Sequence, residues 1–173
     1  MNKHTAQLPD GKVATRNSKT RVYSHAIAYG PARAASLIKI NDGRIAYQQA
    51  ERERYEADAV ALETAQLICT NGYWDAPSVT KYHIAWSHDN IETVDEARAH
   101  GVAQYRKWSE QCAAAIARME AENEKLAAGP ELVGDWEAVA WCGRADLAAK
   151  QAASYAGNPQ GSEVRIIEVE VAA

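Results

Sequence analysis

Short strand-forming runs, separated by polar turn residues, make up the first 30 positions of the chain. Residues 4–8 and 12–15 flank a Pro-Asp-Gly sequence, and an Asp-Gly pair supplies the positive φ angles that a tight hairpin requires. The polar residues 17–20 then precede residues 21–29, which are rich in aromatic and β-branched side chains. We therefore predict a three-stranded β-meander over residues 1–30.

Two long segments show apolar residues at helical spacing. Residues 93–96 form a Thr-x-x-Glu capping box, and the apolar stripe that follows continues to the Gly-Pro stop at 129–130. A looser stripe begins after the turn-forming sequence Asn-Asp-Gly and covers residues 44–68. We predict long helices over residues 44–68 and 93–127. Residues 32–40 either join the first helix or form a strand.

The C-terminal part of the chain shows a strand, a helix and a second strand in order. A short helical pattern stops at the Gly-Asn-Pro sequence of residues 157–159. Residues 164–171 then alternate between apolar and polar side chains, with a change of phase at Ile166 and Ile167 that suggests a β-bulge. These patterns predict a β-α-β tail over residues 136–171.

One short sequence unit occurs three times, each time before a turn and a helical pattern. It consists of a β-branched residue, an alanine and an aromatic residue, at 27–29, 84–86 and 139–141. If the repeat is structural, Tyr29, Trp86 and Trp141 end three strands near one edge of a shared sheet. The alternative is coincidence in an alanine-rich chain.

The alternation of strands and helices predicts the fold class. We expect an α+β or mixed α/β fold in a single domain over residues 1–173, because helices and strands alternate after the N-terminal meander. The expected architecture is one mixed sheet of about five or six strands with two long helices. The helices are too long for a small sheet to cover, so they are expected to pair as a helical arm.

Composition narrows the class of protein. The chain has 173 residues, of which 47% are hydrophobic, and this is enough to bury a core. No run of about 18 apolar residues occurs, and the N-terminus has no signal-peptide core, so we expect a cytoplasmic protein without a membrane partner. The cysteines are odd in number and far apart, which indicates reduced thiols: Cys69, Cys112 and Cys142.

Charge is distributed unevenly along the chain. Residues 1–40 hold seven basic residues and one acidic residue, a net charge of +6, and the whole chain has a net charge of −4. The remaining residues therefore carry −10. Such a basic segment is typical of a nucleic-acid-binding or anion-binding edge. It is equally compatible with a basic segment that folds against its own acidic half.

No sequence motif of a familiar enzyme class is present. The chain lacks GxGxxG, P-loop, HExxH, GxSxG and EF-hand patterns. His25 and His83 are placed like the histidines of two-histidine phosphoesterases, but Ile27 and Ala85 occupy the positions of the required hydroxyl residues. The spacing of His83 and His88 matches no metal-ligand pattern, so no metal or cofactor is predicted. The sequence does not decide whether the protein is an enzyme, but the missing motifs argue against it.

Polar side chains of one predicted strand suggest a binding surface. Arg21, Tyr23 and His25 alternate onto one face, and donors beside an aromatic ring can hold a phosphate and stack a base. Ser24 is not expected to pair with His25, because adjacent strand residues point to opposite faces. The competing interpretation is an edge strand with solvated charges. The candidate anion-binding or nucleic-acid-binding residues are Lys12, Arg16, Lys19, Arg21, Tyr23, His25 and Arg144.

Arg144 is included because it lies at the start of a predicted helix, where backbone N–H groups can receive an anion. The alternative to anion binding is that the Asp146 carboxylate caps the same helix end.

A separate candidate interface lies on the second long helix, whose apolar stripe includes Ile116 and Met119. We expect these two residues to pack on the 44–68 helix or to contact a second copy or a partner.

Three segments resemble small uncharacterised proteins encoded by phages of actinobacteria. They are residues 4–11, 15–25 and 141–148. It implies a phage accessory protein that binds and diverts a host or viral macromolecule. The leading hypothesis is therefore a non-enzymatic intracellular binding protein that contacts a protein partner, or itself, through its long helices. The alternatives are a nucleic-acid-binding or nucleic-acid-processing protein and a small nucleotide-handling enzyme at the ends of the repeated strands.

Overall fold

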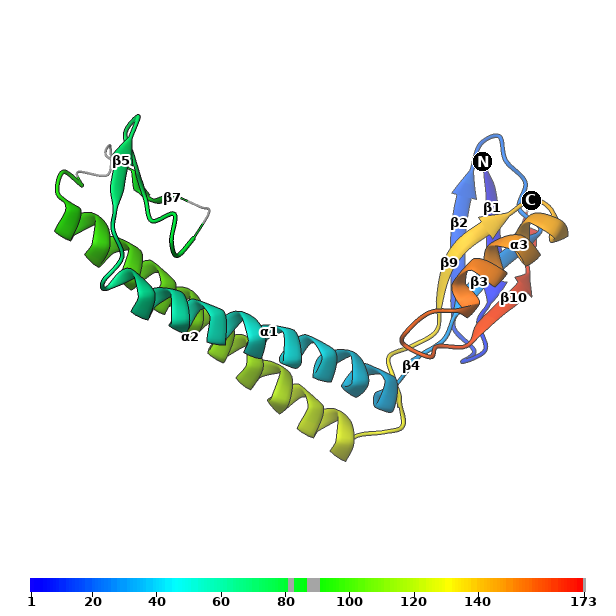
Figure 1. The fold of residues 1–173 in the computed structure, drawn as a ribbon. Coiled ribbons are helices and arrows are strands. Elements are labelled where there is room, and N and C mark those ends of the chain that lie inside the picture. Colours follow the sequence, from blue (N-terminus) through cyan, green and yellow to red (C-terminus); the bar gives the residue numbers. More distant parts are fainter. Residues whose placement is uncertain (81–82, 87–90, 173) are drawn as a thin grey trace. The chain divides into compact units, whose positions relative to one another are not determined.

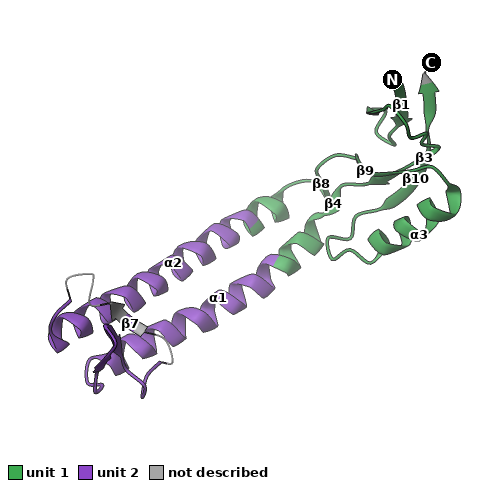
Figure 2. Ribbon diagram, turned by 90° about the horizontal axis from the view of Figure 1, so that it is seen from above, with its two compact units in different colours: residues 1–40, 123–173 green, residues 41–122 purple. Residues whose placement is uncertain are grey.

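The chain folds into two compact units. A computed structural model describes residues 1–80, 83–86 and 91–172. Unit 1 contains residues 1–40 and 123–173, and unit 2 contains residues 41–122 (Figure 2). The boundaries between the units lie within two long helices, α1 (Ala34–Leu62) and α2 (Val94–Ala128). Unit 1 is thus built from both ends of the chain, and unit 2 from one continuous segment.

Unit 1 contains two antiparallel three-stranded sheets and a short two-stranded pair (Figure 1). The first sheet has the order β11-β1-β2 and consists of β1 (Asn2–Gln7), β2 (Val13–Ser18) and β11 (Glu170–Ala172). The second has the order β10-β3-β9 and consists of β3 (His25–Tyr29), β9 (Glu137–Cys142) and β10 (Val164–Glu168). The pair is formed by β4 (Ala32–Arg33) and β8 (Leu132–Val133).

The first two predicted strands form the expected hairpin, but the third does not join them. The β1–β2 turn contains Gly11 with a φ of +84° and closes with a 2.8 Å hydrogen bond from the Leu8 N–H to the Lys12 carbonyl. β3, however, lies between β9 and β10. Its residues Ala26, Ile27 and Ala28 are fully buried, so β3 is a central strand with a partner on each edge, whereas β2 is largely exposed. The predicted meander over residues 1–30 is therefore wrong in its third strand.

The C-terminal segment, which contains β10 and β11, connects the two sheets of unit 1. β10 pairs with β3, β11 pairs with β1, and between them the Val169 N–H donates to the Ser24 carbonyl at 3.0 Å. The expected bulge at Ile166 and Ile167 is absent, because both residues pair in regular register with β3. The irregularity lies at Val169, where the strand passes from one sheet to the other.

Helix α3 (Ala145–Ala156) packs on the second sheet of unit 1. Ala148 of the helix is fully buried in one cluster with Ile27, Ala140 and Cys142 of the sheet. Small side chains on both surfaces allow the helix to approach the strands closely. The elements β9, α3 and β10 correspond to the strand, helix and strand expected over residues 136–171.

Unit 2 combines most of both long helices with a small antiparallel sheet. The sheet has the order β5-β6-β7 and consists of β5 (Ile68–Thr70), β6 (Tyr73–Asp75) and β7 (His83–Trp86). Its core brings residues of both helices against the sheet, with Leu62, Trp74, Ile84 and Tyr105 as large members. A side chain on Gly101 would lie 3.2 Å from the Leu62 side chain, so glycine lets α2 approach this core.

The long helices lie side by side in unit 2, as both ribbon views show (Figures 1 and 2). Ser109 donates to Glu56 across them at 2.9 Å, and Arg106 pairs with Glu63 at 2.8 Å. α1 begins ten residues before the predicted start and continues through the Asn-Asp-Gly sequence at 41–43. Asn41 is buried there, so tertiary packing overrides the turn preference of these residues.

The fold class is α+β, with several small antiparallel sheets in place of one mixed sheet. The prediction that three aromatic residues end strands near one edge of a shared sheet is wrong. Trp86 ends β7 of unit 2, whereas Tyr29 and Trp141 lie toward opposite ends of the antiparallel pair β3–β9. The proposed nucleotide site at parallel strand ends therefore loses its structural basis. Among the described residues, no helix combines the length and the apolar character needed to cross a membrane.

Candidate functional site

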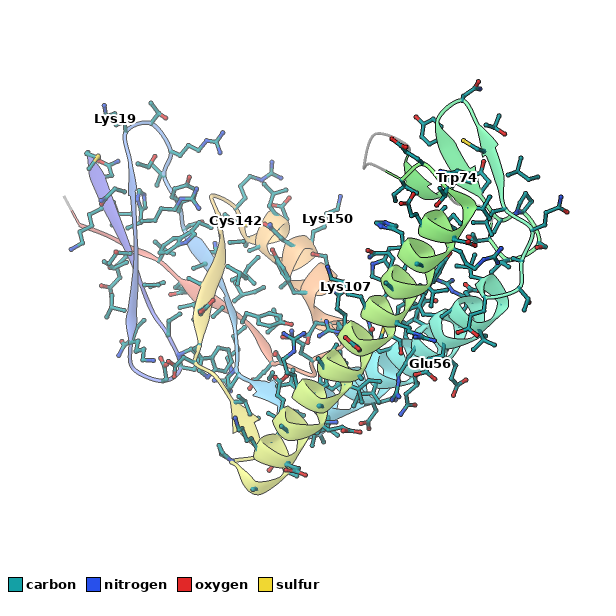
Figure 3. All side chains as sticks on the ribbon, turned by 90° about the vertical axis from the view of Figure 1, so that its left-hand side faces the viewer. Lys19, Glu56, Trp74, Lys107, Cys142 and Lys150 are labelled. Carbon is teal, nitrogen blue, oxygen red and sulfur yellow. The ribbon has the colours of Figure 1, made fainter. Side chains whose placement is uncertain are left out.

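An open cleft of about 640 Å³ lies in unit 1 beside helix α3. Three segments line it: the chain before β3, the end of β9 and one side of α3 (Figure 3 labels Cys142 and Lys150). The lining residues are Arg21, Val22, Tyr23, Trp141, Cys142, Gly143, Leu147, Lys150, Gln151 and Ser154. Its volume is in the range of about 300–1,000 Å³ that is usual for binding sites.

Backbone contacts fix the first two segments against each other. The Ser24 N–H donates to the Cys142 carbonyl at 3.0 Å, which extends the β3–β9 pairing by one step. A side chain on Gly143 would meet the Val22 carbonyl at 3.0 Å, so only glycine allows this close approach without a shift. The Arg21 N–H donates to the Ser18 hydroxyl at 2.8 Å and holds the start of the segment.

The floor of the cleft is aromatic and largely buried. Tyr23 is buried, and its ring meets the Trp141 ring edge-on with centroids 6.2 Å apart. The Cys142 thiol is also buried and donates to the Gln151 side-chain oxygen at 3.2 Å, which ties β9 to α3. A fully buried histidine, His4, packs against the edge of Tyr23 at 5.1 Å and supports the floor.

The lining of the cleft also includes exposed apolar side chains and cations. Val22 is 63% exposed and Leu147 is 48% exposed, so both offer apolar surface to a ligand. Arg21 and Lys150 are the charged residues in the lining, and neither forms an ion pair with any residue that the structure describes. The electrostatic potential of the cleft therefore favours an anionic ligand.

Some of the predicted binding residues come together here. Arg21 and Tyr23 line the cleft, and the Arg16 guanidinium lies over the Tyr23 ring, 5.0 Å from its centroid. His25 is outside the lining, and its Nδ1 lies 2.8 Å from the Ser24 hydroxyl. The expectation that these two side chains diverge is wrong, because Ser24 precedes the first residue of β3 and is not bound by strand alternation.

Two other predicted residues are neutralised by neighbouring carboxylates. Lys12 pairs with Asp135 at 2.7 Å and with Asp10 at 3.6 Å, and the hydrogen bond to Asp135 raises the pKa of the lysine. Arg144 forms two hydrogen bonds with Asp146, at 2.9 and 2.6 Å. At these two positions, carboxylates of unit 1 itself neutralise the positive charge.

The remaining predicted residues lie apart from the cleft. Lys19 belongs to the connection between β2 and β3, without an ion pair among the described residues (Figure 3). On α2, Ile116 is buried and Met119 is half-buried. The chain itself thus covers Ile116, and the role of this pair in contacts with a partner stays a prediction.

Sequence reasoning missed most of the cleft. Val22, Leu147 and Lys150 were not singled out, although α3 is amphipathic and Leu147 lies on its exposed side. Arg21 lies 126 positions before Leu147 and 129 before Lys150, and the pairing of β3 with β9 brings them together. No local pattern could have identified that pairing.

The chemistry of the cleft is that of binding. Its lining contains a phenol, a thiol, amides and cations, with no carboxylate or imidazole among the residues that form it. Within the described part of the chain, no three His, Cys, Asp or Glu side chains are grouped to hold a metal ion; His88 lies outside that part. Comparisons with protein families, curated proteins and solved structures give no match for this chain.

Proposed function

We propose that this protein is a non-enzymatic binding protein that holds an acidic, apolar segment of a partner protein in the cleft of unit 1. One observation carries the proposal: exposed apolar side chains line the same cleft as two cations that pair with none of the described residues. Val22 and Leu147 supply the apolar contacts, and Arg21 and Lys150 attract carboxylates. A segment in which a bulky apolar residue is flanked by Asp or Glu complements both features.

The energetics favour an apolar anchor. Full burial of one valine or leucine side chain contributes about 1.5–3 kcal/mol. Roughly half of Val22 and Leu147 is still exposed, so covering them contributes on the order of 1 kcal/mol each. Protein interfaces concentrate their binding energy in such pockets, and charged rims increase the rate and selectivity of association. The cations therefore select the partner, while the apolar side chains of Val22 and Leu147 hold it.

The resemblance to phage proteins supports the same class of function. We propose on this basis that the protein is a phage accessory protein, acts in the cytoplasm of the host cell, and engages a host or viral macromolecule. Self-association through the long helices is a further proposal. The burial of Ile116 reduces the apolar surface available for such contacts, so the cleft is the better candidate interface.

The test begins with affinity capture from an actinobacterial lysate and continues with the purified partner. Leu147→Asp places a carboxylate in the cleft, so we expect binding at least about tenfold weaker, a change of about 1.4 kcal/mol. Leu132→Asp is the matched control, because Leu132 is similarly exposed in unit 1 but does not line the cleft. Calorimetric titration measures both affinities. Equal effects of the two substitutions would contradict the proposal.

Nucleic-acid binding is the second candidate function. It is favoured by Lys19 and Arg21, which form no ion pair with the described residues, and by Arg16 beside them. If these cations contact phosphates, binding should weaken steeply as salt rises. Lys19→Glu with Arg21→Glu should abolish binding at roughly 50 mM salt, measured by fluorescence anisotropy with duplex and single-stranded probes. An absence of binding by the unaltered protein at that salt concentration would exclude this function.

A further inference from the structure

A second cavity, of about 450 Å³, lies within unit 2 and differs in chemistry from the cleft of unit 1. It is lined by Arg54, Tyr55 and Asp58 of α1, by Tyr105 and Trp108 of α2, and by residues 79–80. Both helices therefore contribute to the cavity. Its lining contains three aromatic rings and one carboxylate.

The three rings form one cluster. The centroid of Trp108 lies 5.4 Å from that of Tyr55 and 5.2 Å from that of Tyr105. Tyr105 is buried, whereas Trp108 is 36% exposed and Tyr55 is half-buried. The cluster is thus anchored in the core by Tyr105 and presents parts of the other two rings to a ligand.

Asp58 is the unusual member of this lining. Its side chain is half-buried, and it has no hydrogen bond or ion pair with any residue that the structure describes. Burial raises the pKa of this carboxyl, which reflects the cost of holding a charge where water is partly excluded. The charge of Arg54 partly offsets this rise, but no cation among the described residues contacts the carboxylate directly, which leaves room beside the aromatic rings for a cation that does.

The chain's own nearby cation is engaged elsewhere. Arg54 lies one turn before Asp58 on α1, but its guanidinium donates to Glu51 at 2.8 Å and lies over the Tyr55 ring at 5.0 Å. This position shows that a guanidinium packs favourably on the cluster. Because Arg54 contacts Glu51 and Tyr55, the Asp58 carboxylate remains able to accept hydrogen bonds from a second cation.

We propose that this cavity binds an organic cation, an ammonium or guanidinium group, between the Asp58 carboxylate and the rings of Tyr55 and Trp108. The carboxylate accepts charge-assisted hydrogen bonds, and the rings stabilise the cation through their π faces. The aromatic rings of the cavity favour a cation on a carbon skeleton over a hydrated metal ion. This site is independent of the function proposed for unit 1.

The test is an NMR titration of the full-length protein that follows the indole N–H signal of Trp108. The probes are ethylammonium, ethylguanidinium and a neutral peptide with one lysine or arginine, up to roughly 50 mM, against sodium chloride at equal ionic strength. Saturable shifts with the small cations would mean that the site binds a small organic cation. Saturable shifts with the peptide alone would mean that it binds a lysine or arginine side chain of a partner protein.

Variants identify the contacts. Asp58→Asn keeps the shape of the side chain and should weaken binding at least about fivefold, because it removes the charge. Glu53→Gln is the matched control, since Glu53 is exposed on α1 and does not line the cavity. Arg54→Met should tighten binding by removing a repelling charge. The proposal is overturned if no probe gives a saturable shift or if the Asp58 and Glu53 variants bind equally.

Discussion

Single side chains hold the ends of elements together in this protein, and Arg98 is one example. Its guanidinium donates from α2 to the carbonyls of Leu62, Glu63 and Ala65, at 2.8, 3.1 and 2.9 Å. These carbonyls belong to the end of α1 and the chain just beyond it, where helical hydrogen bonds run out. One cation thereby caps one long helix from the other.

Replacement of this cation tests its structural role. We expect Arg98→Met to lower the free energy of unfolding by about 1–3 kcal/mol, because hydrogen bonds from a charged donor are lost and partly buried carbonyls are left without partners. Urea denaturation followed by circular dichroism measures the change. Arg118→Met, an exposed position on α2, is the control and should change stability by less than about 0.5 kcal/mol. Similar losses in both variants would rule out the capping role.

At the scale of residues, the sequence was informative only where the chemistry is local. Arg21 and Tyr23 were identified because they alternate along a few positions, and both line the cleft. Leu147 and Lys150 were missed because their significance depends on the distant pairing of β3 with β9. The Asp58 cavity likewise depends on the pairing of two helices, which spacing within one helix does not reveal.

At the scale of elements, signals of local origin predicted the helices better than the sheets. The capping box before α2 forms: Glu96 accepts from the Thr93 N–H at 2.9 Å, and the Glu96 N–H donates to the Thr93 hydroxyl at 3.2 Å. The three similar tripeptides, in contrast, do not share one sheet: two lie in the paired strands β3 and β9 of unit 1, and the third lies in β7 of unit 2. A tripeptide fixes strand propensity, but strand partners are selected by burial over the whole unit.

The capping box predicts a pH dependence of stability. Hydrogen bonds from the Thr93 N–H, the Glu92 N–H and the Thr93 hydroxyl lower the pKa of Glu96. Because its pKa is lower in the folded than in the unfolded chain, Glu96 stabilises the fold above the ordinary glutamate value of about 4.3, and this contribution is lost as pH falls through the folded value. Glu96→Ala should therefore be less stable than the unaltered protein at pH 7, with a difference that shrinks at acidic pH.

Thermal unfolding at a series of pH values measures this difference. Glu120→Ala, on the exposed surface of α2, removes a carboxylate that does not cap the helix and serves as the control. The melting temperature of the control should follow that of the unaltered protein across the series. A constant deficit of the Glu96 variant at all pH values would mean that charge contributes nothing to the cap.

At the scale of the whole molecule, the two cavities with proposed ligands of opposite charge belong to different units. The cleft of unit 1 presents Arg21 and Lys150, whereas the cavity of unit 2 presents Asp58 together with Arg54. Variants of one site should leave the ligand of the other unaffected, provided that each unit keeps its fold. The tests of the two proposals are thus separable.

The division of the chain between the units also determines the order of events during protein synthesis. Residues 41–122 contain all of unit 2, so this unit can collapse once they have left the ribosome. Strand β3 must wait for β9 and β10, which are made last. At about 5–20 residues per second, the 51 residues from 123 to 173 need roughly 3–10 s. We expect the apolar faces of β3 to stay uncovered on the nascent chain for that interval, which exposes a surface that chaperones can bind.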